Sequence, residues 1–172
     1  MRIPIENGLH LAEFRATDKA ACVALIREPE IYRGTLRIPR PYEESHFDEW
    51  LASVAATTER YGEPVQFAVR DGETFLGSIG LGDLRPGHRA ELGYWLGKRW
   101  WGRGIMTAVV AAVCRHAMLR WQLVRITASV FSWNTASARV LEKNGFEYEG
   151  LLRKHHQKDG EFLDSKLYAL VR

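Results

Sequence analysis

The chain shows two hydrophobic periodicities, one typical of strands and one typical of helices. Alternating or β-prone apolar runs, bounded by turn residues, predict the strands. The strands are expected over residues 9–14, 66–70, 74–81, 90–96, 125–131, 146–153 and 162–171. Apolar residues spaced three and four apart predict the helices. The helices are expected over residues 17–26, 43–58, 104–121 and 135–144.

Turn and cap residues indicate how these elements connect. Asp71-Gly72 and Asp159-Gly160 each lie between two strands and predict hairpins. Asn134 is placed to cap the fourth helix, and Gly145 supplies the left-handed stop at its end. Segments without a regular pattern are expected over residues 29–41 and 82–87. This mixed order predicts an α+β (mixed αβ) fold, and it excludes a simple helical bundle and a pure βαβ repeat.

Composition and charge narrow the function classes. The 172 residues, 46% hydrophobic and 26% charged, suit a single domain over residues 1–172. The net charge of +3 agrees with an anionic ligand but is too small to indicate a nucleic-acid surface, so we expect no direct nucleic-acid partner. No apolar run reaches the roughly 18 residues that span a bilayer, and the N-terminus lacks the apolar core of a signal peptide. We therefore expect a cytoplasmic protein with no membrane partner.

The cysteines and histidines do not indicate a metal site. Cys22 and Cys114 fit no metal-ligand spacing, and Cys114 lies in a helical apolar pattern typical of a core residue. His155 and His156 lie beside Lys154 ahead of a turn, and we interpret them as solvated hairpin residues. No bound metal is expected.

The segment over residues 91–107, ELGYWLGKRWWGRGIMT, combines a strand, a glycine-bearing basic loop and the start of a helix. Gly97, Gly102 and Gly104 let backbone N–H groups approach phosphate oxygens, and the helix dipole favours negative charge there. Three basic side chains add positive charge, namely Lys98, Arg99 and Arg103. The loop lacks GxxxxGK[ST], and a GxGxxG pattern starting at Gly102 fails at Thr107. The segment therefore predicts an anion site that is neither a Walker loop nor a Rossmann fingerprint.

This loop resembles the acetyl-CoA loop of the GNAT superfamily of N-acetyltransferases. The family pattern Q/R-x-x-G-x-G/A opens the helix after the fourth strand, and here it falls on residues 101–106. Trp101 stands in place of Gln or Arg, which is typical of the branch of the ribosomal-protein-serine/alanine N-terminal acetyltransferases, and Met106 stands in place of Gly or Ala. Residues 134–150, NTASARVLEKNGFEYEG, resemble the same branch through N-x-x-S and E-K-x-G-F, as does the opening AEFRATD over residues 12–18. The resemblance therefore spans nearly the whole chain.

The resemblance implies the GNAT fold and acetyl-CoA as co-substrate. That fold has a central, twisted, mostly antiparallel sheet of about seven strands, flanked by about four helices. Its fourth and fifth strands splay apart, and the pantetheine arm of acetyl-CoA lies between them. The residues that resemblance assigns to cofactor binding are Tyr94, Trp95, Leu96, Trp101, Gly102, Arg103, Gly104, Ile105, Met106, Thr107 and Asn134.

Three residues are candidates for proton transfer. Glu91, at the head of the cofactor strand, is nominated as the base, acting directly or through water; it can equally be a solvent-facing or arginine-paired glutamate. Ser137 is the candidate proton donor to the departing sulfur, because relatives place the serine of this block near it, and Tyr148 is the fallback donor. Asn134 and Ser137 can also be a helix cap and a neutral first-turn residue. A backbone N–H near Leu96 is expected to polarise the thioester carbonyl.

The expected function is transfer of an acetyl group from acetyl-CoA to a primary amine. The acceptor is a protein N-terminal α-amino group or a small amine, such as a polyamine, an amino acid or an antibiotic. An α-amino group, with a pKa of about 7.7–8.0, needs a weaker base than a lysine near 10.4. Two other interpretations are a non-catalytic acyl-CoA-binding module and, least favoured by the charge, a nucleic-acid binder. Both a monomer and a homodimer remain compatible with the sequence.

Overall fold

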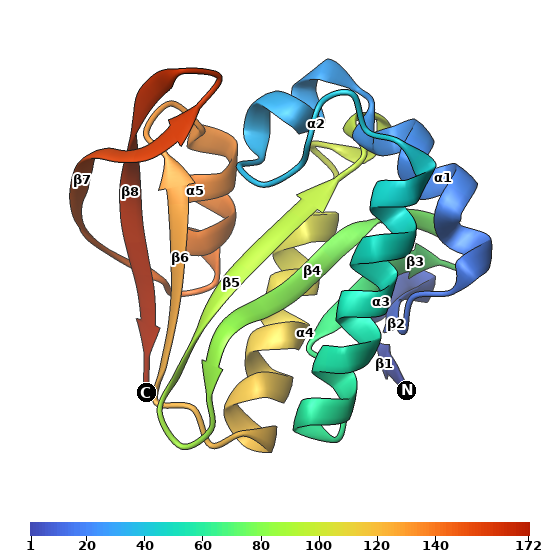
Figure 1. Ribbon diagram of the computed structural model, residues 1–172. Helices are drawn as coiled ribbons and strands as arrows, with labels where there is room; N and C mark the ends of the chain where they lie inside the picture. Colours follow the sequence, from blue (N-terminus) through green and yellow to red (C-terminus); the bar gives the residue numbers. More distant parts are fainter. The chain divides into compact units, whose positions relative to one another are not determined.

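The computed structural model describes residues 1–172, which form five α-helices and eight strands (Figure 1). The strands are β1 (Arg2–Pro4), β2 (Leu9–Ala12), β3 (Gln66–Asp71), β4 (Thr74–Arg85), β5 (Arg89–Leu96), β6 (Arg125–Phe131), β7 (Glu147–Lys158) and β8 (Glu161–Val171). The helices are α1 (Lys19–Ile26), α2 (Pro29–Gly34), α3 (Glu44–Tyr61), α4 (Ile105–Arg120) and α5 (Thr135–Lys143). The sheet order is β1-β2-β3-β4-β5-β6-β8-β7, and the pairing of β5 with β6 is parallel, whereas β1–β2, β2–β3, β3–β4, β6–β8 and β7–β8 are antiparallel.

The expected fold class is confirmed, with corrections to the number and length of its elements. Two elements were not predicted, the short strand β1 and the helix α2 within the proline-containing stretch over residues 29–41. Pro29 begins α2, where its fixed φ and missing N–H are tolerated. The prediction of a loop over residues 82–87 is wrong for residues 82–85, because β4 continues to Arg85. The strand predicted over residues 146–153 is also longer than expected, because β7 extends to Lys158. Because β1 was not predicted, the fourth and fifth predicted strands correspond to β5 and β6.

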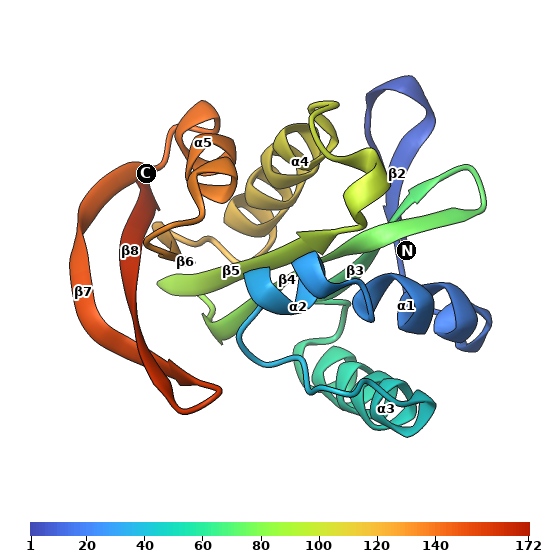
Figure 2. The ribbon, with the colours of Figure 1, turned by 90° about the horizontal axis from the view of Figure 1, so that it is seen from above.

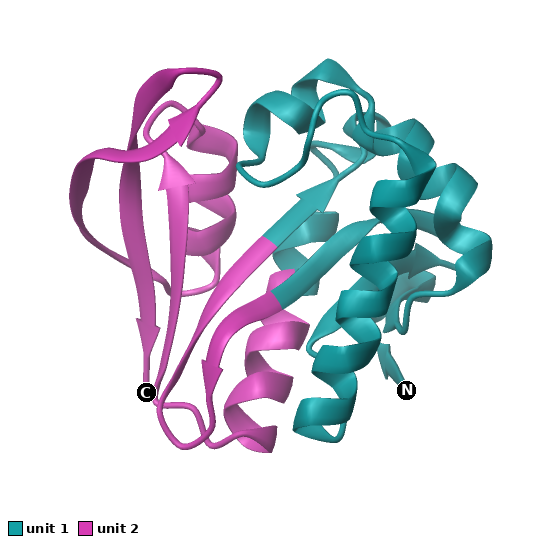
Figure 3. Cartoon of the chain, viewed as in Figure 1, with its two compact units in different colours: residues 1–80, 94–109 teal, residues 81–93, 110–172 magenta.

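The chain divides into two compact units (Figure 3). The first unit contains residues 1–80 and 94–109, and the second contains residues 81–93 and 110–172. Strands β4 and β5 and helix α4 each contribute residues to both units.

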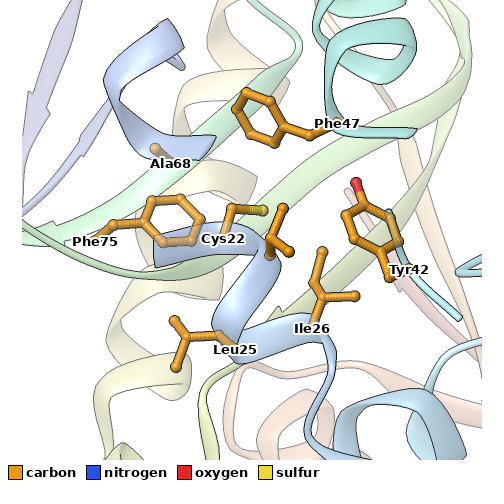
Figure 4. Close-up of a cluster of buried hydrophobic side chains, with 8 residues drawn as sticks. Cys22, Leu25, Ile26, Tyr42, Phe47, Ala68 and Phe75 are labelled. Atoms are coloured by element: carbon orange, nitrogen blue, oxygen red, sulfur yellow. The ribbon is translucent and has the colours of Figure 1, made fainter. Parts of the chain in front are cut away.

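In the first unit, helices α1 and α3 lie together on one side of the strands (Figure 2). Their contact is an apolar cluster in which Cys22, Leu25 and Ile26 of α1 meet Phe47 of α3 and Phe75 of β4 (Figure 4). Burial raises the pKa of the Cys22 thiol to about 12, so this cysteine is a protonated core residue at neutral pH. The cluster fixes α1 and α3 against the sheet.

A buried ion pair joins the start of α1 to β3. The Arg70 guanidinium donates to both carboxylate oxygens of Asp18 at 2.7 and 2.6 Å, and both side chains are buried. The Asp18 carboxylate also accepts the backbone N–H of Arg15 at 2.8 Å, so it reaches back to the turn that precedes the helix. Because both charges are desolvated, each depends on the other for compensation.

In the second unit, α5 and the later turns of α4 lie on the same side of β6 (Figure 2). Ile126, Ala128 and Val130 alternate along β6 and are all buried, so they form the face that packs against these helices. The intervening residues Thr127 and Ser129 point to the opposite face of the sheet. The two faces of β6 therefore differ in chemistry, one apolar and the other polar.

Replacing Arg70 with methionine should leave the Asp18 carboxylate buried and unpaired. We expect Arg70→Met to lower the free energy of unfolding by about 3–5 kcal/mol, measured by urea denaturation at pH 7. Arg15→Ala is the matched control, because its guanidinium pairs with Glu73 at the surface and such pairs contribute about 0–1 kcal/mol. Equal losses in the two variants would contradict the structural role given to the buried pair.

Candidate functional site

The end of β5 is held to β4 by a close backbone approach in the first unit. The N–H of Gly97 donates to the carbonyl oxygen of Leu76 at 2.9 Å. A Cβ atom on Gly77 would lie 2.3 Å from the carbonyl oxygen of Trp95, so only glycine allows the two strands to be this close. The indole N–H of Trp101 donates to the Leu96 carbonyl oxygen at 2.6 Å and ties the following loop back to the strand. The strand end and the loop therefore form one rigid element.

Two glycines shape the backbone just before α4. Gly102 and Gly104 have φ values of 74° and 75°, which L side chains rarely adopt. The Ala108 N–H donates to the Gly104 carbonyl oxygen at 3.2 Å, so the N–H groups of Gly104, Ile105 and Met106 lie ahead of the first intrahelical hydrogen bond. A Cβ atom at either glycine would meet no atom within 4 Å, which leaves this backbone open to an approaching ligand. The arrangement suits phosphate oxygens.

The three basic residues of the loop are not equivalent. Lys98 forms an ion pair with Glu30, which raises the pKa of the lysine, and its backbone N–H donates to Glu28 Oε2 at 3.1 Å. The Arg99 guanidinium lies over the Trp100 ring, 4.0 Å from its centroid. Arg103 is exposed and has neither an ion-pair partner nor an aromatic ring beneath it, so it is the basic side chain most available to an anion.

Several predicted cofactor residues turn their side chains into the protein. Leu96 and Met106 are buried, and Trp95 packs against the apolar cluster of the first unit, 5.9 Å from the Phe75 ring. Leu96 and Met106 can therefore reach a ligand only through their backbone. Met106 therefore does not obstruct the loop, although it replaces the family's glycine or alanine. Tyr94 and Thr107 are half-buried, and Trp101 is 47% exposed.

In the second unit, β5 and β6 pair over only three residues. The register joins Arg89 to Arg125, Ala90 to Ile126 and Glu91 to Thr127, and then stops although both strands continue. The predicted separation of the fourth and fifth strands is therefore found between β5 and β6. Glu91 stands at the last paired position, half-buried, with its side chain on the same face as that of Thr127. Beyond this position the backbone groups of β5 and β6 are no longer paired with each other.

The remaining candidates also belong to the second unit. Asn134 caps α5, because its Oδ1 accepts the Ser137 backbone N–H at 3.1 Å, so the cap interpretation is confirmed and the two residues are neighbours. Tyr148 on β7 is 54% exposed and lies edge-on to the Tyr168 ring at 5.7 Å. Glu91 and Tyr148 are not brought together, since β6 and β8 separate their strands.

His155 and His156 lie in the β7–β8 hairpin as predicted, and His155 is exposed, but His156 is less solvated than expected. His156 is half-buried with its Nε2 3.3 Å from Ser129 Oγ, and His155 has its Nδ1 2.7 Å from Ser165 Oγ. The strand runs past both of them to Lys158. Nothing in the local sequence indicates these contacts, because they depend on how β6, β7 and β8 pair. No group of three or more His, Cys, Asp or Glu side chains is arranged to hold a metal ion. The helices are all too short or too polar to cross a bilayer.

Comparison with known proteins identifies similar chains and structures. Residues 9–147 match the Acetyltransferase (GNAT) domain family. The chain is 34% identical over 157 residues to [Ribosomal protein uS5]-alanine N-acetyltransferase of Escherichia coli (strain K12), covering 84% of this chain and 81% of that protein. It is 29% identical over 148 residues to L-amino acid N-acetyltransferase AaaT of the same organism, covering 84% and 86%.

The fold agrees with a solved structure of RimL, described as a ribosomal L7/L12 alpha-N-protein acetyltransferase in complex with coenzyme A. The TM-score is 0.90 at 21% identity, covering 99% of this chain and 98% of that one, which supports the fold. Matches to two uncharacterized N-acetyltransferases, YoaA of Bacillus subtilis (strain 168) and p20 of Bacillus licheniformis, span 59% of the length of each relative.

Proposed function

The chain belongs to the GNAT acetyltransferase family, and we propose that it transfers an acetyl group from acetyl-CoA to the α-amino group of a protein N-terminus. The observation that carries the proposal is the open loop before α4, with its two left-handed glycines and exposed Arg103, at the family's acetyl-CoA position. The 34% identity to an enzyme named for a ribosomal-protein alanine supports the choice of acceptor. The same proposal places the chain in the cytoplasm.

The roles of the residues follow from the chemistry of thioester aminolysis. The N–H groups from Gly102 to Thr107, with Arg103, hold the pyrophosphate, and Asn134 contributes a further contact. A backbone N–H near Leu96 donates to the thioester oxygen as negative charge develops on it, and such donors typically contribute several kcal/mol. Bound acetyl-CoA supplies an activated acyl group.

Proton movement is the other requirement of the reaction. The acceptor nitrogen must be neutral to attack, and roughly a quarter of α-amino groups are neutral near pH 7.4. We assign Glu91 as the residue that receives the amine proton, directly or through water, and Ser137 as the donor to the departing sulfur. Tyr148 is the second choice as donor, because it is an exposed residue of β7. The half-buried position of Ser137 in the first turn of α5 supports the first choice.

A small amine is the second candidate acceptor. The 29% identity to an L-amino acid N-acetyltransferase over 84% of this chain favours a free amino acid within that class. Both acceptors present a primary amine, so the same loop and the same proton path serve either one. The two candidate acceptors differ in the rest of the molecule, which is a polypeptide chain in the first case and a single amino acid in the second.

A transfer assay with a panel of amines separates these functions. We expect release of free thiol with peptides that begin with alanine or serine, and one added acetyl group by mass spectrometry. The same peptides blocked at the α-amine but carrying an internal lysine should react at least 100-fold more slowly, because the lysine amine is only about 0.1% neutral near pH 7.4. Reaction with free amino acids alone would select the second candidate. Binding of CoA without transfer to any amine would indicate a non-catalytic acyl-CoA-binding module.

Gly104→Val should weaken CoA binding, because valine is strained at φ 75° and its side chain occupies the surface offered to phosphate. We expect a loss of affinity of about 10-fold or more by calorimetric titration. Gly62→Val is the matched control, since Gly62 has the same φ and an equally open Cβ position at the end of α3. Equal CoA affinity in folded Gly104→Val and Gly62→Val would refute the loop assignment.

Ser137→Ala should lower turnover more than cofactor affinity. The cap of α5 uses the Ser137 backbone N–H, which alanine keeps, so the helix start is preserved. We expect kcat to fall by about 10²-fold or more while the CoA dissociation constant changes less than about 2-fold. Thr135→Ala in the same helical turn is the control. A parallel loss of affinity and turnover would reduce Ser137 to a binding or structural role.

A further inference from the structure

A cluster of polar side chains in the second unit lies outside the residues assigned above. It consists of Ser129 on β6, His155 and His156 on β7, and Ser165 on β8, and we call it the histidine cluster. The Nε2 of His156 is 3.3 Å from Ser129 Oγ, and the Nδ1 of His155 is 2.7 Å from Ser165 Oγ. The two imidazole centroids are 4.2 Å apart. Each histidine therefore has a hydroxyl partner on a neighbouring part of the sheet.

A bulge in β7 brings the two histidines together. The register with β8 shifts between Leu152, which pairs with Ser165, and His156, which pairs with Leu163. Lys154 inside the bulge has a φ of 50°, rare for a residue with a side chain, and its N–H donates to Asp164 Oδ1 at 2.7 Å. Successive residues of a regular strand point to opposite faces, and the bulge removes that alternation. His155 and His156 can thus reach hydroxyl groups on one side of the sheet.

The face that carries this cluster is the one that carries Glu91. Ser129 is two residues beyond Thr127 on β6, and Thr127 pairs with Glu91, so all three side chains share a face. It is opposite to the apolar face of β6 that packs against the helices. Ser129 also lies beyond the point where β6 stops pairing with β5. His156 packs edge-on against Phe131 of this face, with ring centroids 5.9 Å apart, which fixes the imidazole beside Ser129.

We propose that Ser129 and His156 form a proton-accepting pair for the acceptor amine. This inference rests on the proposed function. The ammonium R–NH3+ passes one proton to Ser129 Oγ as the serine proton moves to His156 Nε2, which leaves R–NH2. The amine lone pair forms the N–C bond, the C–S bond breaks with its electrons on sulfur, and the second amine proton leaves as CoA–SH. His156 then releases its proton to solvent. Ser129 contacts the substrate, and His156 acts through it.

An imidazole suits this role because a base is most effective when its pKa lies near the working pH. The titratable and charged groups nearest His156 by the observed contacts are His155, which packs against it, Lys154 with its partner Asp164, and Lys158, which lies against the same Phe131 ring. On the same face of the sheet, Glu91 is carried by β5. The Lys158 ammonium lies 6.0 Å from the centroid of the Phe131 ring, and burial lowers its pKa. The second unit therefore offers two proton acceptors on one face, Glu91 and the serine–histidine pair.

The test compares His156→Gln with His155→Gln, the same substitution one residue earlier in the bulge. Glutamine keeps a polar partner for Ser129 but cannot accept a proton. With an alanine-initiated peptide at pH 7, we expect kcat to fall about 100-fold in His156→Gln and less than about 3-fold in His155→Gln. CoA affinity by calorimetry should stay within about 2-fold of the parent in both. Thermal unfolding monitored by circular dichroism checks that each variant is folded.

The pH dependence separates proton transfer from a structural role. The parent kcat should fall as the pH drops, because a protonated His156 cannot take another proton. In His156→Gln the acidic limb of the kcat–pH profile should move toward the pKa range of the amine, near 8. The loss of kcat relative to the parent should therefore shrink as the pH rises to about 9. A structural defect would give the same loss at every pH. In the parent, the His156 imidazole NMR signals should shift when CoA and the peptide are both added.

Ser129→Ala is a second, independent test of the pair, and it can be used even if His156→Gln does not fold. We expect a similar loss in kcat, and the double variant should be little worse than either single one because the pair acts as a unit. A pH-independent loss, or equal effects of His155→Gln and His156→Gln, would overturn the pair and leave acetyl transfer standing. A parent protein that binds CoA but acetylates no amine would overturn the proposed function and this inference with it.

Discussion

The parallel pairing of β5 with β6 ends after three residues, and the proposed function depends on that ending. Strand β5 continues through Leu92 and Gly93 without a partner in β6, although backbone N–H and C=O groups need hydrogen-bond partners. A sheet that opens in this way exposes the same kind of edge that proteins use to bind an extended ligand. Glu91 and Thr127 mark the last paired position. In the proposed function, this open edge is the surface at which the backbone of β5 meets the extended arm of acetyl-CoA.

Glycine at selected positions makes this backbone surface accessible. Gly77 allows the carbonyl oxygen of Trp95 to approach within a distance that any side chain would forbid. Gly102 and Gly104 turn the chain into α4 with open space where a Cβ would stand. Inward packing of Leu96 and Met106 then provides rigidity while the N–H groups remain at the surface. In the proposed function, specificity for an anion comes from this backbone geometry, with Arg103 as the side-chain contribution.

Local signals in the sequence were sufficient wherever a few neighbouring residues decide the structure. The extent of β6, the start of α4, the cap formed by Asn134 and the stop at Gly145 were all predicted closely. Errors occurred where distant pairing decides, because β1 is only three residues long and exists through its partner β2. The ion pair of Lys98 with Glu30 and the contact of His156 with Ser129 join residues 68 and 27 positions apart. No pattern within a short window contains that information.

The chemistry of the proposed acceptor favours a face that offers more than one kind of base. Moving a proton from an α-ammonium with a pKa of about 7.8 to an ordinary glutamate near 4.3 is uphill by about 3.5 units, roughly 4.8 kcal/mol. An ordinary imidazole near 6.5 reduces this to about 1.3 units, roughly 1.8 kcal/mol. A carboxylate is nevertheless the better attractor for the incoming ammonium, since it is charged at neutral pH. A carboxylate that attracts the ammonium and can take up a proton, and an imidazole that accepts a proton more readily, therefore complement each other. The polar face of β6, with Glu91 beside Thr127 and His156 beside Ser129, provides both.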